Sequence, residues 1–211
     1  MQRPWAGICL ALIATLLGGC SRSPNATFYA LYPREGAVLP SEPLQIGLRR
    51  PELPGHLDRP QIVRRTERLR LEFSSAARWG SPLDDMIATT LTEALAQRLP
   101  RANVYSDAGA ISSPADVLVE LEVQRFELHG SRVELHAQVA LYWPERAVRA
   151  TLHRYVLSLP AEGEETRYIV ERMSELLARL SDALAETIAA DAAAPAAPPP
   201  EASPLEPTPL R

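Results

Sequence analysis

One cysteine in this sequence stands where its thiol can undergo chemistry. Cys20 directly follows Gly18 and Gly19, which close an apolar run, and the only other cysteine of the chain is Cys9, inside that run. A cysteine thiolate is a strong nucleophile, open to alkylation or to disulfide formation. If the apolar run is removed, Cys20 has no second sulfur to pair with. The sequence therefore excludes a disulfide framework.

The residues before Cys20 have the layout of a signal peptide. Arg3 supplies a positive charge, and residues 5–17 are uncharged and almost wholly apolar. A run of about a dozen residues is too short for a membrane-spanning helix, which needs roughly 20. It matches the apolar region of a secretory signal instead. We therefore predict that residues 1–19 are a signal peptide.

The residues around the predicted cleavage point resemble a bacterial lipobox. Leu17 stands three positions before Cys20, and small residues fill the two positions between them. In lipoproteins with this motif the thiol receives a diacylglyceryl group and the freed amine a further acyl chain, and two or more chains give stable anchoring. Ser21, rather than Asp, follows the cysteine, which favours the outer membrane. The alternative is an ordinary secretory signal with a chance cysteine.

Other residues that carry chemistry are sparse. A Gly-rich phosphate loop and a nucleophile elbow are absent from the sequence. Two of the four histidines, His136 and His153, could meet across strands, but without a well-placed carboxylate they make a weak metal site. The formal net charge of −4 does not suggest nucleic acid as a partner. We predict no metal, no cofactor beyond the lipid on Cys20, and no enzymatic activity.

Apolar alternation predicts the strands of a sheet. We expect strands at residues 28–32, 44–48, 67–73, 103–106, 116–128, 133–141 and 147–159. Within 116–128 the parity of the apolar residues changes near Gln124 and Arg125, which indicates a β-bulge. Residues 129–131 are expected to turn the chain, so that the last three strands form a meander. The prolines of residues 49–65 predict a long irregular loop, a type of segment that is often functional.

Two further stretches have helical spacing. Ser81 is expected to cap the first helix and Pro82 to occupy its first position, with Pro100 ending it. Residues 164–189 form a longer amphipathic helix, whose apolar stripe most simply packs on a core. Two such helices can cover one or both faces of a mixed sheet. We predict a single α/β or mixed α+β domain, with about five to seven strands and two long helices packed on them.

Composition sets the boundaries of this domain. Residues 20–26 are expected to link the lipidated cysteine to the fold, and residues 27–191 to form the domain. Residues 192–211 are dense in proline and alanine and lack apolar periodicity. Such a segment cannot bury enough surface to fold, so we predict a disordered tail.

Two stretches carry a resemblance to a known family. "LPGHLDRPQIVRR", residues 53–65, is followed by "ARWGSPLDDMI", residues 77–87. In this pairing and spacing the chain resembles the PqiC/YmbA family, the auxiliary lipoproteins of ABC-type transport systems. His56 stands where that family usually carries an aromatic residue, and Gly80–Ser81 replaces a more usual Ala-Glu pair.

The resemblance implies a lipoprotein on the periplasmic face of the outer membrane. It implies a docking component of an intermembrane lipid-transport system, with an MCE-domain protein as partner and a ring of identical subunits as a possible assembly. Two other functions stay open at this point. One is a lipid-binding carrier with an acyl cavity between sheet and helix, and the other is an envelope-stress or assembly lipoprotein without a transport role.

Four residues of the two stretches are candidates for binding the partner. Asp58 and Arg59 lie between prolines in a pre-shaped charged loop, and Arg78 stands beside Trp79, a pairing common at interfaces. A structural reading competes with this one. Arg78 would then pair with Asp58 or Asp84, and Trp79 would fill the core beside the first helix.

Overall fold

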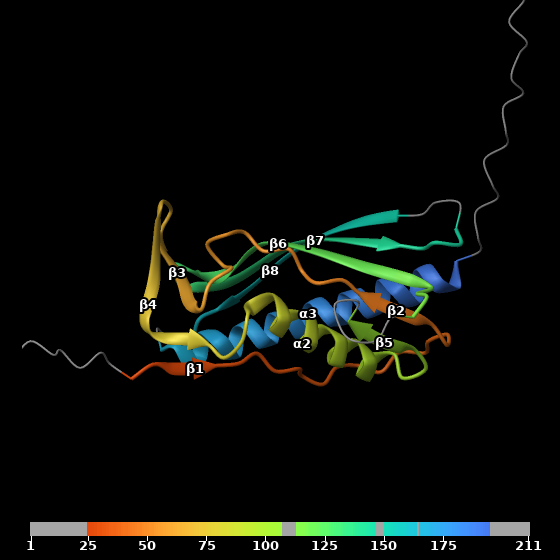
Figure 1. Ribbon diagram of the computed structural model, residues 1–211, viewed down its shortest axis with the longest axis horizontal. Coiled ribbons are helices and arrows are strands. Elements are labelled where there is room, and N and C mark those ends of the chain that lie inside the picture. The colour runs from red at the N-terminus through yellow and green to blue at the C-terminus, as the bar shows by residue number, and fades with distance from the viewer. Residues whose placement is uncertain (1–24, 107–112, 147–149, 164, 195–211) are drawn as a thin grey trace, which may run out of the picture.

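Figure 1 shows a computed structural model of the chain, which describes residues 25–106, 113–146, 150–163 and 165–194. One curled mixed sheet of eight strands carries two helices on one face. The elements are β1 (Thr27–Tyr29), β2 (Gln45–Leu48), β3 (Gln61–Glu67), β4 (Arg70–Trp79), α2 (Leu83–Arg98), β5 (Asn103–Ser106), β6 (Val117–His129), β7 (Arg132–Tyr142), β8 (Ala150–Pro160) and α3 (Thr166–Ala193). The predicted single-domain α/β fold is confirmed, with one strand more than the upper estimate. Cys20, the predicted signal peptide and residues 195–211 of the predicted tail lie outside the described residues.

β6 is the central strand of the sheet. One of its edges pairs with β7 along its whole length, and β8 follows β7, all antiparallel. Its other edge pairs in parallel first with β2 and, near its end, with β3. The sheet then continues from β3 to β4 and β1, and from β2 to β5. The predicted meander of β6, β7 and β8 is confirmed.

The predicted β-bulge is also confirmed. The register between β6 and β7 shifts between Val123 and Arg125. Before the shift the buried residues of β6 have odd numbers, as in Leu121 and Val123, and after it Phe126 and Leu128 are buried. An extra residue in one strand of an antiparallel pair reverses the parity in this way.

The prediction for residues 49–73 is wrong in part. We expected a loop as far as Arg65 and one half-buried strand over residues 67–73. The chain instead forms a β-hairpin of β3 and β4, with its turn at Arg68 and Leu69. Leu69, expected on the buried face, is 94% exposed at the tip. The hairpin projects from the body of the molecule (Figure 1), so the apolar residues that alternate near its turn do not pack in the core.

The two helices lie between the sheet and the N-terminal segment, which runs along their far side (Figure 1). α2 has Asp84 and Asp85 in its first turn, as expected, but its N-cap residue is Pro82 and no side chain caps it, so the predicted capping role of Ser81 is wrong. α3 is 28 residues long and buries its apolar stripe from Ile169 to Ile188. Within the described part of the chain, neither helix is long and apolar enough to cross a membrane.

A buried arginine joins the two helices to the N-terminal segment. Arg98, in the last turn of α2, has no exposed surface. Its Nε donates to Asp182 Oδ1 of α3 at 2.6 Å, and its other nitrogens donate to the carbonyls of Arg34, Ala94 and Ala178 at 3.0–3.2 Å. A Cβ on Gly36 would overlap both Arg98 and Asp182. Because glycine has no Cβ, the N-terminal segment can pass close to the ion pair between Arg98 and Asp182 at this point.

This ion pair gives the first prediction. Asp182→Asn should lower the free energy of unfolding by about 1–2 kcal/mol, because it leaves the buried guanidinium of Arg98 without its partly exposed carboxylate. Chemical denaturation followed by circular dichroism measures the loss. Arg179→Gln, which removes an exposed ion pair on the same helix, is the matched control and should cost less than about 0.5 kcal/mol. Equal losses in the two variants would contradict the assignment.

Candidate functional site

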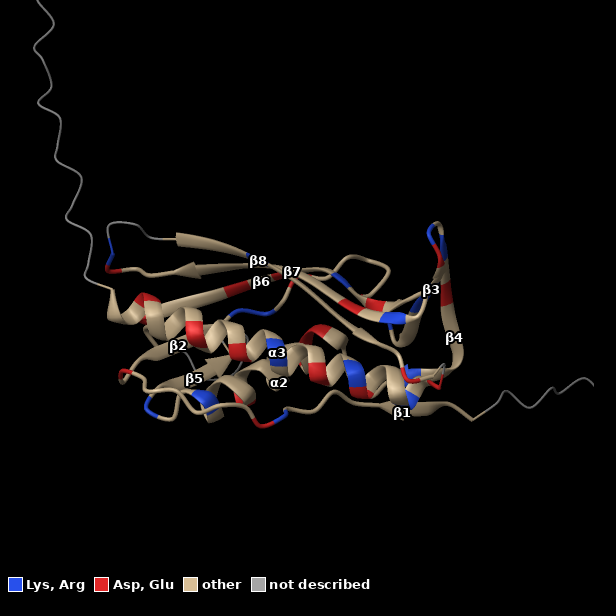
Figure 2. Ribbon diagram, turned by 180° about the vertical axis from the view of Figure 1, so that it is seen from behind, with Lys and Arg blue, Asp and Glu red and all other residues tan. Residues whose placement is uncertain are grey.

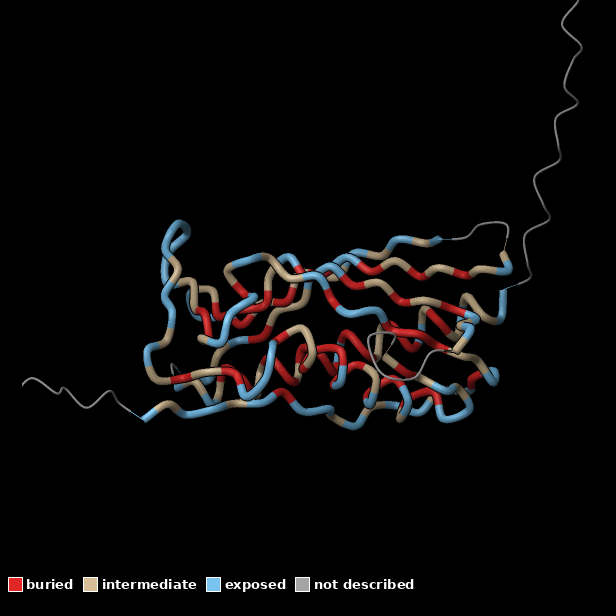
Figure 3. Tube along the Cα trace, viewed as in Figure 1, coloured by how far each residue is buried: buried red, intermediate tan, exposed pale blue. Residues whose placement is uncertain are grey.

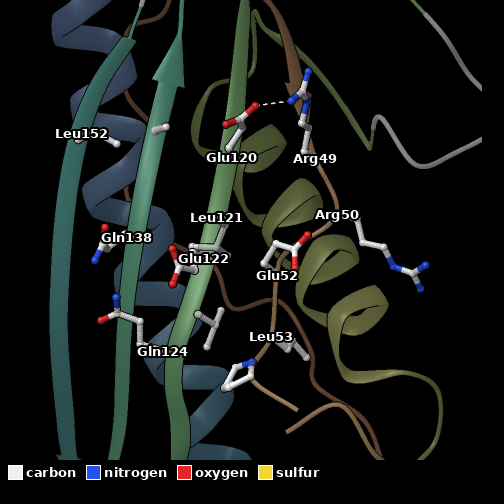
Figure 4. A pocket seen from close by; sticks show the side chains of 13 residues that line it. Arg49, Arg50, Glu52, Leu53, Glu120, Leu121, Glu122, Gln124, Gln138 and Leu152 are labelled. Atoms are coloured by element: carbon white, nitrogen blue, oxygen red, sulfur yellow. Dashed lines mark hydrogen bonds and ion pairs between the residues drawn. The ribbon is translucent and has the colours of Figure 1, made fainter.

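A groove of about 880 Å³ lies on the face of the sheet that points away from the helices (Figure 4). Its floor is formed by β6, β7 and the start of β8, and its wall is the chain that follows β2. The lining residues are Arg49, Arg50, Glu52, Leu53, Pro54, Glu120, Leu121, Glu122, Val123, Gln124, Gln138, Ala140 and Leu152. Glu122 and Leu152 of its lining are exposed, so the groove is open to a partner.

The wall of the groove is fixed by hydrogen bonds to β6. The Arg49 N–H donates to the carbonyl of Val119, and the Glu52 N–H to that of Leu121, each at 2.9 Å. The Val123 N–H donates back to the carbonyl of Glu52, also at 2.9 Å. The segment therefore continues the ladder between β2 and β6 and keeps its side chains at the rim of the groove.

The groove carries an excess of negative charge. Arg49 pairs with Glu120, and Arg50 points away from the groove, to Asp84 and Asp85 of α2, each at 2.6 Å. Glu52 and Glu122 lie side by side in an isolated bridge between the wall and β6. Both are exposed, and neither has an ion pair with another described residue. The acidic rim lies opposite an apolar side formed by Ala140 and Leu152, the latter 77% exposed.

The predicted loop residues Asp58 and Arg59 lie beside this groove. Asp58 is exposed and lines a smaller hollow of about 170 Å³, which shares Arg50, Glu52 and Leu53 with the groove. The Arg59 guanidinium lies 4.5 Å from the centre of the Phe73 ring, on the hairpin. Both side chains are thus available on the surface, and their role in binding a partner stays a prediction.

The other two predicted residues lie deeper in the fold. Trp79 is 5% exposed, and its backbone N–H donates to the carbonyl of Pro60 at 2.8 Å. It fills the core, as the structural reading expected. Arg78 is half-buried and has no ion pair with a described residue, and Asp84 pairs with Arg50 instead. The alternative in which Arg78 pairs with Asp58 or Asp84 is therefore wrong.

The same loop is held to the sheet by a buried carboxylate. Glu127 of β6 has no exposed surface, and its Oε1 accepts a hydrogen bond from Arg65 Nε of β3 at 2.6 Å. Its Oε2 lies 3.3 Å from His56 Nε2 in the loop. Burying a carboxylate is costly unless a cation compensates it, and the Arg65 guanidinium of β3 is that cation. His56 places the loop next to the same carboxylate.

A cluster of charged residues continues the outer face beyond the bulge. Arg125 of β6 donates to Glu134 Oε2 of β7 at 2.5 Å, and His129 and His136 lie 3.4 and 3.6 Å from the same oxygen. Burial raises the pKa of the Glu134 carboxyl, but hydrogen bonds and charge from Arg125 and His129 outweigh it, so the pKa is lowered overall. Burial and the charge of Arg125 lower the pKa of the His136 imidazole. In the described ranges no group of three or more His, Cys, Asp or Glu is placed to hold a metal ion.

Sequence reasoning missed the groove itself. The β6 side of the groove could have been predicted. Alternate residues from Val117 to Val123 are buried, so Glu120, Glu122 and Gln124 lie on the opposite face of the same strand. The position of Glu52 next to Glu122 had no such signal. It depends on a long-range pairing that the sequence pattern does not encode.

The fold and the groove can be compared with known proteins. Residues 29–185 match the profile of the family described as ABC-type transport auxiliary lipoprotein component. The chain therefore belongs to this family of auxiliary lipoproteins of ABC-type transport, and its resemblance to PqiC/YmbA proteins is confirmed. No curated protein matches the sequence.

Two solved structures share the fold. A crystal structure of a protein from Xanthomonas campestris is 18% identical, covers 79% of this chain and 97% of its own, and superposes with a TM-score of 0.67. A crystal structure described as an uncharacterized protein is 17% identical, covers 78% of this chain and 99% of its own, with a TM-score of 0.65. At these identities the likeness is one of fold.

The charged cluster gives a prediction about pH. Because the pKa of folded His136 lies below its ordinary value, the neutral imidazole stabilises the fold above about pH 6.5. That contribution is lost as the pH falls through the lowered pKa. Arg125→Gln should raise the pKa of His136, because it removes a nearby positive charge while Glu134 remains.

An NMR titration of the His136 ring measures this shift. Arg132→Gln is the control, since Arg132 lies on the same strand and hydrogen-bonds Ser158 instead, so the pKa of His136 should not change. An unchanged pKa in the Arg125 variant would show that Arg125 does not lower it.

Proposed function

We propose that this lipoprotein is a non-catalytic docking component of an MCE-type lipid-transport system, anchored to the periplasmic face of the outer membrane. Membership of the auxiliary lipoprotein family supports a role beside an ABC-type transporter. The observation that carries docking is the open groove on the sheet face opposite the helices. The partner is a periplasmic MCE-domain protein.

The composition of the groove supports protein binding. Its carboxylates Glu52 and Glu122, the amides of Gln124 and Gln138, and the exposed Leu152 combine charge, hydrogen-bonding groups and one apolar anchor. Interfaces commonly place an apolar anchor inside a polar rim. Asp58 extends this surface through the adjoining hollow, Arg59 lies over Phe73 of the hairpin, and Trp79 holds the end of the loop through its backbone bond to Pro60. Arg78 stays a candidate contact beside them.

The core gives less support to the alternative of a lipid carrier. Carriage of an acyl chain requires a cavity between the sheet and the helices. In that layer the described side chains pack into one contiguous hydrophobic cluster, with Leu121, Leu135 and Leu177 at most 3% exposed. The envelope-stress or assembly alternative has no specific observation in its favour.

We include a ring of identical subunits in the proposal. β8 is an eleven-residue strand that pairs with β7 alone among the described strands, and its outer face carries the exposed Val156 beyond the groove. Open strand edges with apolar side chains are templates for association. Light scattering on the domain without its anchor measures the subunit number.

The anchor is tested at Cys20. Cys20→Ser should remove the protein from the outer-membrane fraction, because it removes the sulfur that would carry the diacylglyceryl group. Cys9→Ser is the matched control and should leave the protein in the membrane, since the signal peptide is removed. Mass spectrometry of the wild-type N-terminus should find a diacylglyceryl group and an N-acyl chain, and an unacylated terminus would refute the anchor.

Docking is tested in the groove. Glu122→Arg and Leu152→Asp should each weaken binding of the purified MCE-domain protein about tenfold, the effect of removing an interface residue worth about 1.4 kcal/mol. Glu186→Arg, an equal charge reversal at an exposed position of α3, should bind like the wild type. Biolayer interferometry with folded variants provides the affinities. Full binding by both groove variants would move the docking site elsewhere.

A further inference from the structure

The β3–β4 hairpin projects at the same end of the long axis as the first described residue. Figures 1 and 2 show this arrangement from opposite sides, and the end of α3 lies at the other end of the molecule. The hairpin is exposed around its turn, from Thr66 to Arg70, and becomes buried toward its base (Figure 3). Its turn, Arg68–Leu69, presents a leucine side chain that is 94% exposed.

More apolar side chains lie on the strands of this end. Phe28 of β1 is 65% exposed, and Phe73 of β4 is 42% exposed beneath the guanidinium of Arg59. Aromatic rings and arginines with apolar stems are favoured at the boundary between lipid and water. This composition suits a bilayer interface better than bulk water.

The charges at the tip leave one cation free. Glu67 lies opposite Arg70 in the hairpin register, and Glu72 lies 3.7 Å from Arg70. Arg68 is exposed and has no ion pair with any described residue. The tip has no strong net charge, so attraction to a membrane would come from insertion of Leu69 and from contacts of Arg68 with lipid phosphates.

The chain length allows this end to reach a membrane. Five residue steps separate Cys20 from Asn25, which span at most about 18 Å when fully extended. Thr27 pairs with Ala77 of β4. From Ala77 back to Arg70, the first residue of β4 at the tip of the hairpin, the strand spans about 23 Å. An anchored molecule standing on this end therefore brings the hairpin to the bilayer surface.

We propose that the tip of the β3–β4 hairpin is a second membrane contact, with Leu69 inserted among the phospholipid headgroups and Arg68 bound to their phosphates. The inference rests on the lipid anchor of the proposed function. The anchor holds the tip at a high effective concentration next to the bilayer, so that one leucine and one arginine suffice for a contact that would be negligible in a free protein. The two contacts together fix the orientation of the domain on the membrane.

A fluorescent label on the tip tests this contact. Leu69→Cys introduces a free thiol into the mature chain, because Cys9 is removed and the sulfur of Cys20 is acylated. The mature lipoprotein is labelled with an environment-sensitive dye and reconstituted into phosphatidylethanolamine–phosphatidylglycerol vesicles that contain a brominated lipid. Glu145→Cys, in the turn after β7 at the opposite end, receives the same label as the matched control.

We expect the label at position 69 to shift to the blue and to lose most of its emission to the brominated chains, and the label at position 145 to do neither. A mass spectrum of the same preparation reports on the anchor. Acylated protein with an unquenched label at position 69 overturns the hairpin contact and leaves the proposed function intact. An unacylated terminus overturns the anchor, and the hairpin contact with it.

Discussion

The rest of the structure depends on one strand, β6, which hydrogen-bonds along both edges and separates two environments. Its inner face packs on the helices, and its outer face carries the groove and the charged cluster. A shift of one residue along such a strand would exchange its two faces. The β-bulge after Val123 shifts the register by one residue, so the numbering parity of the inward-facing residues changes at that point. Without it, Arg125, Glu127 and His129 would point into the hydrophobic core.

Local patterns were sufficient to predict most of this arrangement. The alternation of apolar residues predicted β6, its bulge and the meander, and apolar residues at helical spacing predicted both helices. Each of these signals depends only on which side of one element is buried. The β3–β4 hairpin was missed for a physical reason. Its turn contains Arg68 and Leu69 and none of the Gly, Pro, Asn or Asp residues that usually mark a turn, and alternation continues through it as in one strand.

Contacts between distant segments could not be predicted in this way. Arg98 at the end of a helix looks like an ordinary solvated cation, yet it is fully buried against Asp182, 84 residues away. The groove has the same origin, since Glu52 and Glu122 meet through the pairing of the chain after β2 with β6. For Trp79 the sequence left partner binding and core packing open, and its burial agrees with core packing.

The long axis of the molecule connects the proposed anchor with the proposed docking surface. The first described residue and the hairpin lie at one end, and the groove lies on the flank, over the middle of β6 and β7 (Figures 1 and 4). A domain standing on the first end would keep this flank clear of the lipid headgroups. An anchor alone would let the domain tilt until the flank met the membrane, because a short linker restricts distance but not direction. A second contact at the hairpin removes that freedom, and the groove then faces sideways, toward a protein that approaches through the periplasm.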